Sequence, residues 1–347
     1  MAYFNFSSKI RRSLVLRVFV ICLALLIFPV IVYASYVTLI DAPRHVLWHL
    51  LFFFLAVIFL GGAITSILVK RMAQPLRQLD EVIVEVEKGN LAARYSPDKL
   101  GFEINILGAH FNKAMDSIVE LNIGHEIQKS LFPKKLPTVP GIELGAGIHF
   151  AKEVGGDFYD LFTHGSKLHI TIADTSGKGV GACLYSLGVR GMLRSFASDP
   201  LQEAIVSTNN LFCEDTGDTG SFVTAWIGCY DPHSHSLEYS SCGHPHALLF
   251  RDHKVTELST PGIALGTVSF TSVNTAHLKL QRGDLVILFT DGVTEARDEN
   301  GKMFGKLRLI DAIQQNKHLS AQTLVDTILA RISREDDDIT LVALKAF

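Results

Sequence analysis

Two long apolar runs open the chain, at residues 18–40 and 46–69, and each is long enough to cross a bilayer, which takes about 20 residues. Lysine and arginine flank the outer ends of both runs, whereas the loop between them carries only Asp41 and Arg44 as charges. This distribution predicts that both ends of a membrane anchor at residues 1–70 face the cytoplasm. A cleavage-like sequence at Val32-Tyr33-Ala34 leaves open that the first run is a signal peptide.

Apolar positions recur at heptad spacing in the next stretch. One set steps by three and four residues from Leu76 to Val86, and a second set does so from Ile104 to Leu121. Gly89-Asn90 interrupts them, so two helices joined by an extended connector are expected, each seeking a parallel partner. Residues 71–121 resemble a HAMP domain, the dimeric helical relay behind membrane spans in bacterial signalling proteins. A plain coiled-coil stalk is the alternative.

Residues 122–140 read as a helical linker that ends in three prolines. Ile123, Ile127 and Leu131 recur every four residues and therefore lie on one face of a helix. That face is too narrow to fold alone. We expect it to dock either on a partner segment or on the domain that follows, and to carry a signal into that domain.

Residues 141–347 read as one domain in which short strands and separate helices alternate with turns. The predicted strands are residues 142–150, 158–163, 167–174, 222–230, 236–241, 247–251, 273–280, 285–290 and 339–345. The predicted helices are residues 179–197, 200–212, 306–315 and 321–334. This order predicts an α+β fold, with two packed sheets and helices outside them.

Composition narrows the class of protein. Of all residues, 48% are hydrophobic and 19% are charged, which agrees with membrane segments, and the net charge of −3 does not suggest a nucleic-acid partner. Five scattered cysteines without a CxxC pair indicate free thiols in a reducing compartment. Cys242, His244 and His246 lack the usual zinc pairing and are interpreted as structural.

Acidic residues stand at the ends of several predicted strands. Asp174 ends one apolar strand and is followed by glycines, and Asp291-Gly292 ends another. Further acids flank them at residues 155–160 and 337–340. Acids that converge in this way repel one another unless a cation lies between them. The Ser176-Gly177-Lys178-Gly179 sequence is not a nucleotide-binding P-loop, because the required earlier glycine and following Ser or Thr are absent.

Five motifs in order resemble the SpoIIE/RsbU-like branch of the protein phosphatase 2C-type (PPM) serine/threonine phosphatases. They are GGDFYD at residues 155–160, ADTSGKG at 173–179, CGHPHALL at 242–249, FTDGVTEA at 289–296 and DDITL at 337–341. The resemblance covers residues 123–347 and implies an α-β-β-α sandwich with two Mg²⁺ or Mn²⁺ ions at one end. Two such ions supply an attacking hydroxide and neutralise phosphoryl charge.

The resemblance also implies roles for individual residues. Asp174 bridges the ions, the carbonyl of Thr175 and Asp157 help to hold one of them, and Asp291 and Asp337 hold the other. Asp157 and Asp174 are thus the expected catalytic acids. Asp338 stands where relatives have an adjacent Asn, and Asp160 and Asp336 are expected to be solvated or structural.

One departure affects the leaving group. Larger members of the superfamily carry a His two residues after the bridging acid, and Ser176 stands there in this chain. Either water supplies the proton or assistance to the leaving group is weak. No Cys-x5-Arg signature is present, which disfavours a covalent cysteine mechanism.

The leading hypothesis is a multi-pass protein of the inner (plasma) membrane with a cytoplasmic metal-dependent phosphatase domain. The resemblance implies a phosphorylated anti-sigma factor antagonist, a small STAS-domain protein, as substrate, and homodimers formed through the HAMP helices. A non-catalytic signalling module of the same fold is the alternative. A membrane histidine kinase is set aside, because no helix with a phospho-acceptor His leads into an ATP lid.

Overall fold

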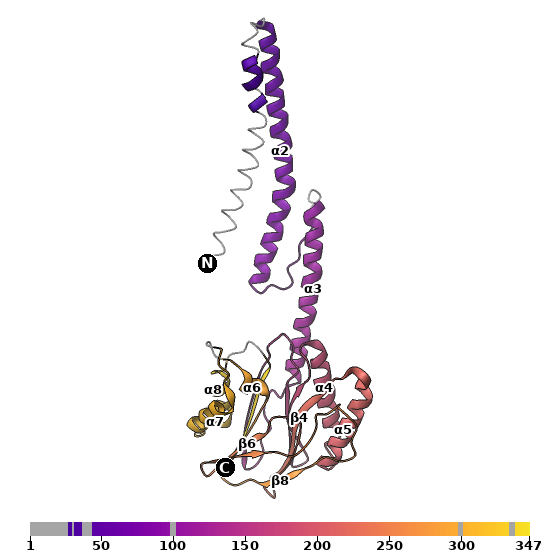
Figure 1. The fold of residues 1–347 in the computed structure, drawn as a ribbon, viewed down its shortest axis with the longest axis vertical. Coiled ribbons are helices and arrows are strands. Elements are labelled where there is room, and N and C mark those ends of the chain that lie inside the picture. The colour runs from indigo at the N-terminus through magenta and orange to yellow at the C-terminus, as the bar shows by residue number, and fades with distance from the viewer. Residues whose placement is uncertain (1–26, 30, 37–43, 98–101, 298–300, 333–336) are drawn as a thin grey trace. The chain divides into compact units, whose positions relative to one another are not determined.

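The computed structural model describes residues 27–29, 31–36, 44–97, 102–297, 301–332 and 337–347. The chain divides into two compact units, Met1–Val119 and Glu120–Phe347. The first unit contains helix α2 (Arg44–Glu87) and the start of helix α3 (Phe102–Leu131), both labelled in Figure 1. The second unit holds the sheets.

The structure describes the predicted membrane segments only in part. The first run, residues 18–40, lies largely outside the described residues, whereas the second, residues 46–69, lies inside α2. Helix α2 continues without a break past Pro75 to Glu87. In the stretches that the structure describes, no helix combines the length and the apolar character that crossing a membrane requires.

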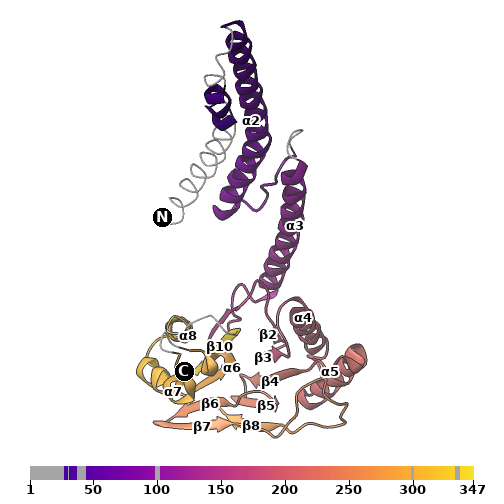
Figure 2. The same cartoon turned by 45° about the horizontal axis from the view of Figure 1, so that its top comes forward.

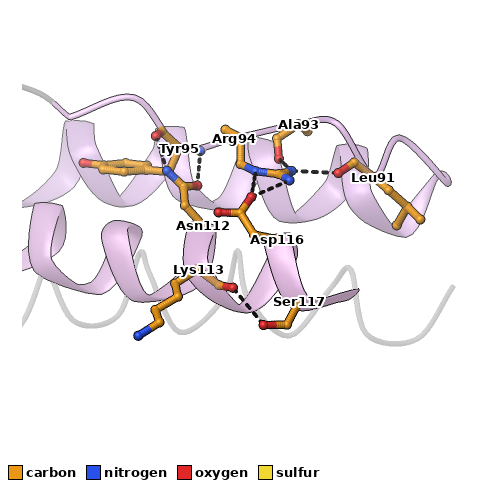
Figure 3. Close-up of polar contacts among 8 residues, drawn as sticks. All are labelled: Leu91, Ala93, Arg94, Tyr95, Asn112, Lys113, Asp116 and Ser117. Atoms are coloured by element: carbon orange, nitrogen blue, oxygen red, sulfur yellow. Dashed lines mark hydrogen bonds and ion pairs between the residues drawn. The ribbon is translucent and has the colours of Figure 1, made fainter. Parts of the chain in front are cut away.

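The connector after α2 packs along α3 through polar contacts of two residues, Arg94 and Tyr95 (Figure 3). The Arg94 guanidinium donates to Asp116 Oδ1 from Nε at 3.0 Å and from Nη2 at 2.8 Å. Asn112 Oδ1 accepts a hydrogen bond from the backbone amide of Tyr95 at 2.8 Å, and Asn112 Nδ2 donates to the Tyr95 carbonyl at 2.9 Å. The Tyr95 ring is buried over Gly108, where any Cβ would overlap it. These contacts fix the extended connector that the sequence predicts.

The second unit is built on two five-stranded antiparallel sheets (Figure 2). One sheet has the order β1-β10-β9-β6-β7 and the other β2-β3-β4-β5-β8. The strands are β1 (Ile142–His149), β2 (Phe158–His164), β3 (Lys167–Thr175), β4 (Val223–Asp231), β5 (Ser236–Cys242), β6 (Ala247–Arg251), β7 (Lys254–Leu258), β8 (Ala276–Lys279), β9 (Leu285–Phe289) and β10 (Ile339–Ala346). The helices of this unit are α4 (Val180–Ser195), α5 (Leu201–Thr216), α6 (Asp291–Glu295), α7 (Gly305–Asn316) and α8 (Ala321–Leu329), with a short 3-10 turn at Gly217–Thr219.

Three buried apolar clusters hold these layers together. The first lies between the two sheets and includes Ile170, Trp226 and Val342. A second joins the β9–β10 sheet to α7 and α8, and a third joins the β3–β4 sheet to α4 and α5. Successive residues of one strand therefore face different layers, as Ile172 and Ala173 do. The predicted α+β fold with two packed sheets and outer helices is confirmed.

The predicted strands all form, and in the described part of this unit β7, α6 and the 3-10 turn at Gly217–Thr219 appear although they were not predicted. Strand β7 is an edge strand with three exposed positions among five, so its sequence KVTEL lacks a clear apolar alternation. Helix α6 is a single short turn that begins at Asp291, too short for helical periodicity to mark it.

Candidate metal centre

Strand register brings the predicted acids to one end of both sheets. In one sheet Phe158 of β2 pairs with Ala173 of β3, so Asp157, just before Phe158, and Asp174, just after Ala173, lie at the same edge. In the other, Phe289 of β9 pairs with Leu341 of β10, which places Asp291 and Asp337 just beyond the paired ends. Antiparallel pairing thus gathers two acids in each sheet, and the face-to-face packing of the sheets brings the two pairs to one end.

Asp157 is buried and joins the two sheets. Its Oδ2 atom accepts hydrogen bonds from Thr290 Oγ1 at 2.8 Å and from Thr340 Oγ1 at 2.6 Å. The backbone amide of Thr340 in turn donates to Thr290 Oγ1 at 3.0 Å. Burial raises the pKa of Asp157 well above its ordinary range, and the charge of Asp174 raises it further. The two threonines were not predicted, although each stands beside a predicted acid.

Asp174 lies at the electrostatic centre of the group. Burial raises its pKa to about 7, and the negative charges of Asp291 and Asp337 add to the increase. The pKa of Asp291 is also raised, first by burial and then by Glu295 and Asp337. Carboxylates that resist ionisation because of one another are stabilised in their charged form by a cation.

Lys178 is a neighbour that the sequence did not single out for this site. Its ammonium lies 2.9 Å from Asp337 Oδ1, and Asp337 also accepts the amide of Asp338 at 2.9 Å. The SGKG sequence around it is therefore part of the acidic centre, although it is not a P-loop. The only available signal was its position four residues after Asp174.

The donor set fits hard divalent cations in its chemistry. All the predicted ligands offer oxygen, which Mg²⁺ and Mn²⁺ prefer. Thr175 Oγ1 is buried without a hydrogen-bond partner in the described part of the chain. Among the residues that the structure describes, no three Asp, Glu, His or Cys side chains are already placed to hold one ion. Water and backbone carbonyl oxygen would therefore complete each coordination shell.

Asp338 supports the loop before Asp157. Its Oδ2 accepts the amides of Gly156 at 2.7 Å and Asp157 at 3.3 Å, and its Oδ1 accepts the amide of Ala151 at 2.9 Å. A Cβ on Gly155 would overlap the Asp338 carboxylate, which explains why glycine is needed there. Asp338 thus positions the loop through three backbone amides.

Helix α3 holds the same loop from the other side. Gln128 is fully buried, donates through Nε2 to the Gly155 carbonyl at 2.8 Å and accepts the Gly155 amide at 3.2 Å. His125 contacts the carbonyl of Glu153, and Arg190 donates to the carbonyl of Leu131 at 2.8 Å. The linker therefore contacts the rest of the second unit two residues before Asp157, through polar groups that apolar periodicity does not reveal.

The apolar face of the linker was expected to dock either on a partner segment or on the domain that follows, and the structure does not show the second arrangement. Ile123 and Ile127 are each 55% exposed and Leu131 is 38% exposed, so they do not dock on the domain that follows. Gln128 and Phe132 make that contact instead, the latter against Tyr159 with ring centroids 5.2 Å apart. A partner segment remains the expected partner of this face.

Replacing Gln128 by Ala is expected to weaken metal binding about tenfold, the lower range for loss of an outer-shell contact. The change leaves the buried amide and carbonyl of Gly155 unpaired and frees the loop that carries Asp157. Titration with Mn²⁺ in a calorimeter measures the affinity. Lys129→Ala, at the next and exposed position of α3, is the control. Equal affinities in the two variants would contradict a positioning role for Gln128.

Asp160 and Ser176 have structural partners, whereas Asp336 is not described by the structure. Asp160 is buried and paired with Arg190 and Arg194, so it is structural and not solvated. Asp336 lies outside the described residues. Ser176 Oγ accepts the amide of Phe222 at 3.0 Å, and the Ser176 amide donates to the Phe222 carbonyl at 2.9 Å. Ser176 therefore fastens the β3 end to the start of β4.

Cys242, His244 and His246 each have separate surroundings in the structure. The four described cysteines are free, and Cys242 is buried. His244 is buried with Nδ1 2.9 Å from Thr224 Oγ1, whereas His246 pairs with Glu257 at 3.1 Å. Their partners differ, and these residues form no metal cluster within the described chain.

His244 is expected to make the second unit acid-sensitive. Burial lowers its pKa to about 3, whereas the unfolded chain takes up this proton near pH 6.5. Stability is therefore lost as pH falls below the unfolded value, by about 2 kcal/mol at pH 5. Urea unfolding followed by Trp226 fluorescence, in a Trp48→Phe background, measures the loss. His244→Asn should lose less stability between pH 7.5 and 5, and an equal loss in both proteins would contradict the assignment.

Comparison with known proteins agrees with this geometry. The model of the family described as Stage II sporulation protein E (SpoIIE) matches residues 164–347, and the HAMP domain model matches residues 67–120. The phosphoserine phosphatase RsbU of Bacillus subtilis is 29% identical over 234 residues, which cover 65% of this chain and 70% of RsbU. Protein IcfG of Synechocystis sp. is 28% identical over 263 residues, 65% of this chain but 41% of IcfG. The chain thus spans about two fifths of the length of IcfG.

A solved structure gives the same fold. The SiaA-PP2C domain of Pseudomonas aeruginosa superposes with a TM-score of 0.58 at 20% identity, covering 67% of this chain and 98% of that domain. At this identity the likeness shows the fold alone. The order of motifs, the HAMP match and the sandwich thus point to the same class of protein.

Proposed function

Because this chain belongs to the SpoIIE family of PP2C-type serine phosphatases and carries a HAMP domain, we propose that it hydrolyses phosphoserine or phosphothreonine in a protein with two divalent cations. The observation that supports this most strongly is the convergence of Asp157, Asp174, Asp291 and Asp337 at one end of both sheets. Burial raises the pKa of Asp174, and the charges of Asp291 and Asp337 raise it further, which supports a shared site for these acids.

The residues have distinct parts in the proposed mechanism. Asp174 would lie between two Mg²⁺ or Mn²⁺ ions, with Asp157 and the Thr175 carbonyl on one side and Asp291 and Asp337 on the other. When bound, such ions supply a nucleophile from water at neutral pH and offset the charge of the phosphoryl oxygens. The Thr290 and Thr340 hydroxyls hold Asp157 in one orientation. Lys178, beside Asp337, adds a positive charge near the place where the phosphate would lie.

The proton for the leaving serine or threonine comes from water in this proposal. Ser176 stands where larger relatives carry a His, and its Oγ atom already accepts the Phe222 amide. Its hydroxyl is also a weak acid compared with imidazole. Ser176→Ala is therefore expected to change stability more than the pH profile of turnover.

The proposed substrate is a phosphorylated anti-sigma factor antagonist of the STAS type, acting in a partner-switching pathway. The resemblance to RsbU, whose name describes a phosphoserine phosphatase, supports this class. The test is release of phosphate from a phosphorylated STAS-domain protein by the purified chain with Mn²⁺, with Mg²⁺ and with excess chelator. We expect turnover with metal only. Turnover that persists in chelator would overturn the metal-dependent mechanism.

A non-catalytic module that only binds its partner is the second candidate. The four acids argue against it, since a binding module does not need mutually repelling carboxylates at the end of a sheet. It would be favoured if the chain bound the phosphorylated STAS protein tightly without releasing phosphate under any metal condition.

We also propose that the chain is dimeric and held at the inner membrane by residues 1–70, with residues 71–121 as relay and 122–140 as linker. The HAMP match supports membrane association. Exposed Leu76, Ile83, Leu107 and Ile118 supply apolar positions for a second copy of these helices. A Cys introduced at exposed Glu203, in a background without native cysteines, should label in intact cells only after permeabilisation. Labelling from outside would refute a cytoplasmic phosphatase domain.

A further inference from the structure

A basic pocket lies at the end of the β1-β10-β9-β6-β7 sheet that is opposite to the acidic centre. Leu285, where β9 begins, and Lys345, near the end of β10, line it together with the β6–β7 turn and the end of α7. Asp291 and Asp337 follow and precede the other ends of the same two strands. Figure 2 shows α7 close to the ends of β6 and β7. The pocket is therefore separate from the proposed catalytic site.

The size of the pocket suits a small molecule. Its volume is about 500 Å³, within the range of about 300–1,000 Å³ typical of ligand sites. Phe250 and Leu285, both buried, form an apolar floor. Polar groups stand around this floor, so the pocket offers apolar contact and charge to the same ligand.

The charge of the lining is strongly positive in a chain whose net charge is −3. Arg251, Lys254, Lys317 and Lys345 line the pocket with His253 and His318, and Asp252 is the one acidic lining residue. Asp284, outside the lining, offsets Arg251 through hydrogen bonds of 2.8 and 2.5 Å. No ion-pair partner for the ammonium groups of Lys254 and Lys317 is present among the described residues. Unneutralised cations at a cavity attract anions.

Part of this charge is held in place before any ligand arrives. Lys345 donates to the carbonyls of Lys317 at 3.1 Å and Leu319 at 2.7 Å, which fixes its ammonium at the end of α7. An ammonium has three donors, so one remains for a ligand. Arg251 is fixed by Asp284 and by the Lys279 carbonyl at 2.9 Å. Fixed donors lose little side-chain entropy on binding.

The turn at the rim has an unusual backbone. Asp252 and His253 have φ values of 43° and 65°, although neither is glycine. Two-residue hairpin turns of this kind favour Asn-Gly, since a side chain in the left-handed region costs about 1 kcal/mol or more. The turn places two polar side chains, those of Asp252 and His253, at the rim of the pocket, where an Asn-Gly turn would place only one.

From these features we propose that the pocket binds a small soluble phosphate ester with a flat apolar part, of which a mononucleotide is the representative class. Lys254, Lys317 and Lys345 would contact the phosphates, and the apolar part would lie over Phe250 and Leu285. The proposal does not depend on phosphatase activity, because the pocket lies at the other end of β9 and β10.

The test is calorimetric titration of the purified full chain with ADP, inorganic pyrophosphate and uncharged adenosine, in excess chelator so that no metal bridges anions to the acidic centre. We expect ADP to bind saturably, pyrophosphate more weakly and adenosine weakest. Lys254→Glu with Lys317→Glu should weaken ADP binding by about tenfold or more. Both residues are exposed, so the thermal midpoint should change little.

Lys167→Glu is the matched control. Lys167 and Lys254 each begin the second strand of a two-residue hairpin, in the pairs His164–Lys167 and Arg251–Lys254, and both are exposed. Lys167→Glu should leave ADP affinity unchanged. Absence of ADP binding, equal loss in both variants, adenosine binding as tightly as ADP, or binding only to phosphatidylglycerol vesicles would each overturn the proposal.

Discussion

Asp174→Asn is expected to lower phosphatase turnover by at least about a hundredfold, the scale on which loss of one electrostatic contact to a transition state acts. The substitution keeps the shape of the side chain and removes the charge that would lie between two cations. Calorimetry with Mn²⁺ should show weaker or fewer metal sites in the same protein. The phosphate-release assay with a phosphorylated STAS-domain protein measures turnover.

The same variant should remain as stable as the natural chain without metal, or become more stable. Burial and the charges of Asp291 and Asp337 raise the pKa of Asp174 to about 7. A group whose pKa is raised on folding destabilises the folded state once pH exceeds its unfolded value near 4. Removing that ionisation relieves the cost. Asp199→Asn, at an exposed acid, is the activity control. Full turnover of Asp174→Asn would contradict the two-metal proposal.

Asp160→Ala is expected to destabilise the phosphatase unit by about 3 kcal/mol, as breaking a buried ion pair does. Asp160 accepts two hydrogen bonds from Arg194, at 2.6 and 2.8 Å, and lies 3.3 Å from Arg190 Nε. Its side chain is 3% exposed and that of Arg190 is 13% exposed, so the arginine would be left buried and unpaired. Urea unfolding followed by Trp226 fluorescence measures the change.

The control for Asp160 is an exposed ion pair in the same unit. Glu257 lies 2.5 Å from Lys306, and both side chains are more than 40% exposed. Glu257→Ala should therefore cost less than about 1 kcal/mol. Equal effects of the two substitutions would show that burial does not determine the contribution of Asp160.

Much of the fold was predictable because burial leaves a period in the sequence. The strand at residues 167–174 alternates cleanly and extends by only one residue in the structure, as β3 (Lys167–Thr175). Strand β7 was missed because an edge strand buries little, and α6 because one helical turn has no period to detect. The order in which the strands pair was not predictable in this way, because no local sequence pattern indicates that β10 pairs with β1.

The candidate site was predictable where it consists of acids at strand ends. The register brings Asp157, Asp174, Asp291 and Asp337 to one edge, as motif order implied. The supporting residues were not predictable in the same way. Gln128 acts through one polar side chain on an otherwise exposed stretch of helix, and Lys178 is positioned by a loop. Such contacts depend on three-dimensional neighbours and leave no periodic signal.

The place of β10 in its sheet has a consequence for folding. It is the last strand in the sequence, yet it lies between β1 and β9 and so cannot be added at an edge. The hydrogen bond from Thr340 to Asp157 joins residues 183 positions apart. Such non-local closure slows folding, because loop entropy is lost before the contacts form. We therefore expect a late folding step in which insertion of β10 completes the core and the acidic centre together, and a nascent chain lacking β10 to expose the edges of β1 and β9 to aggregation.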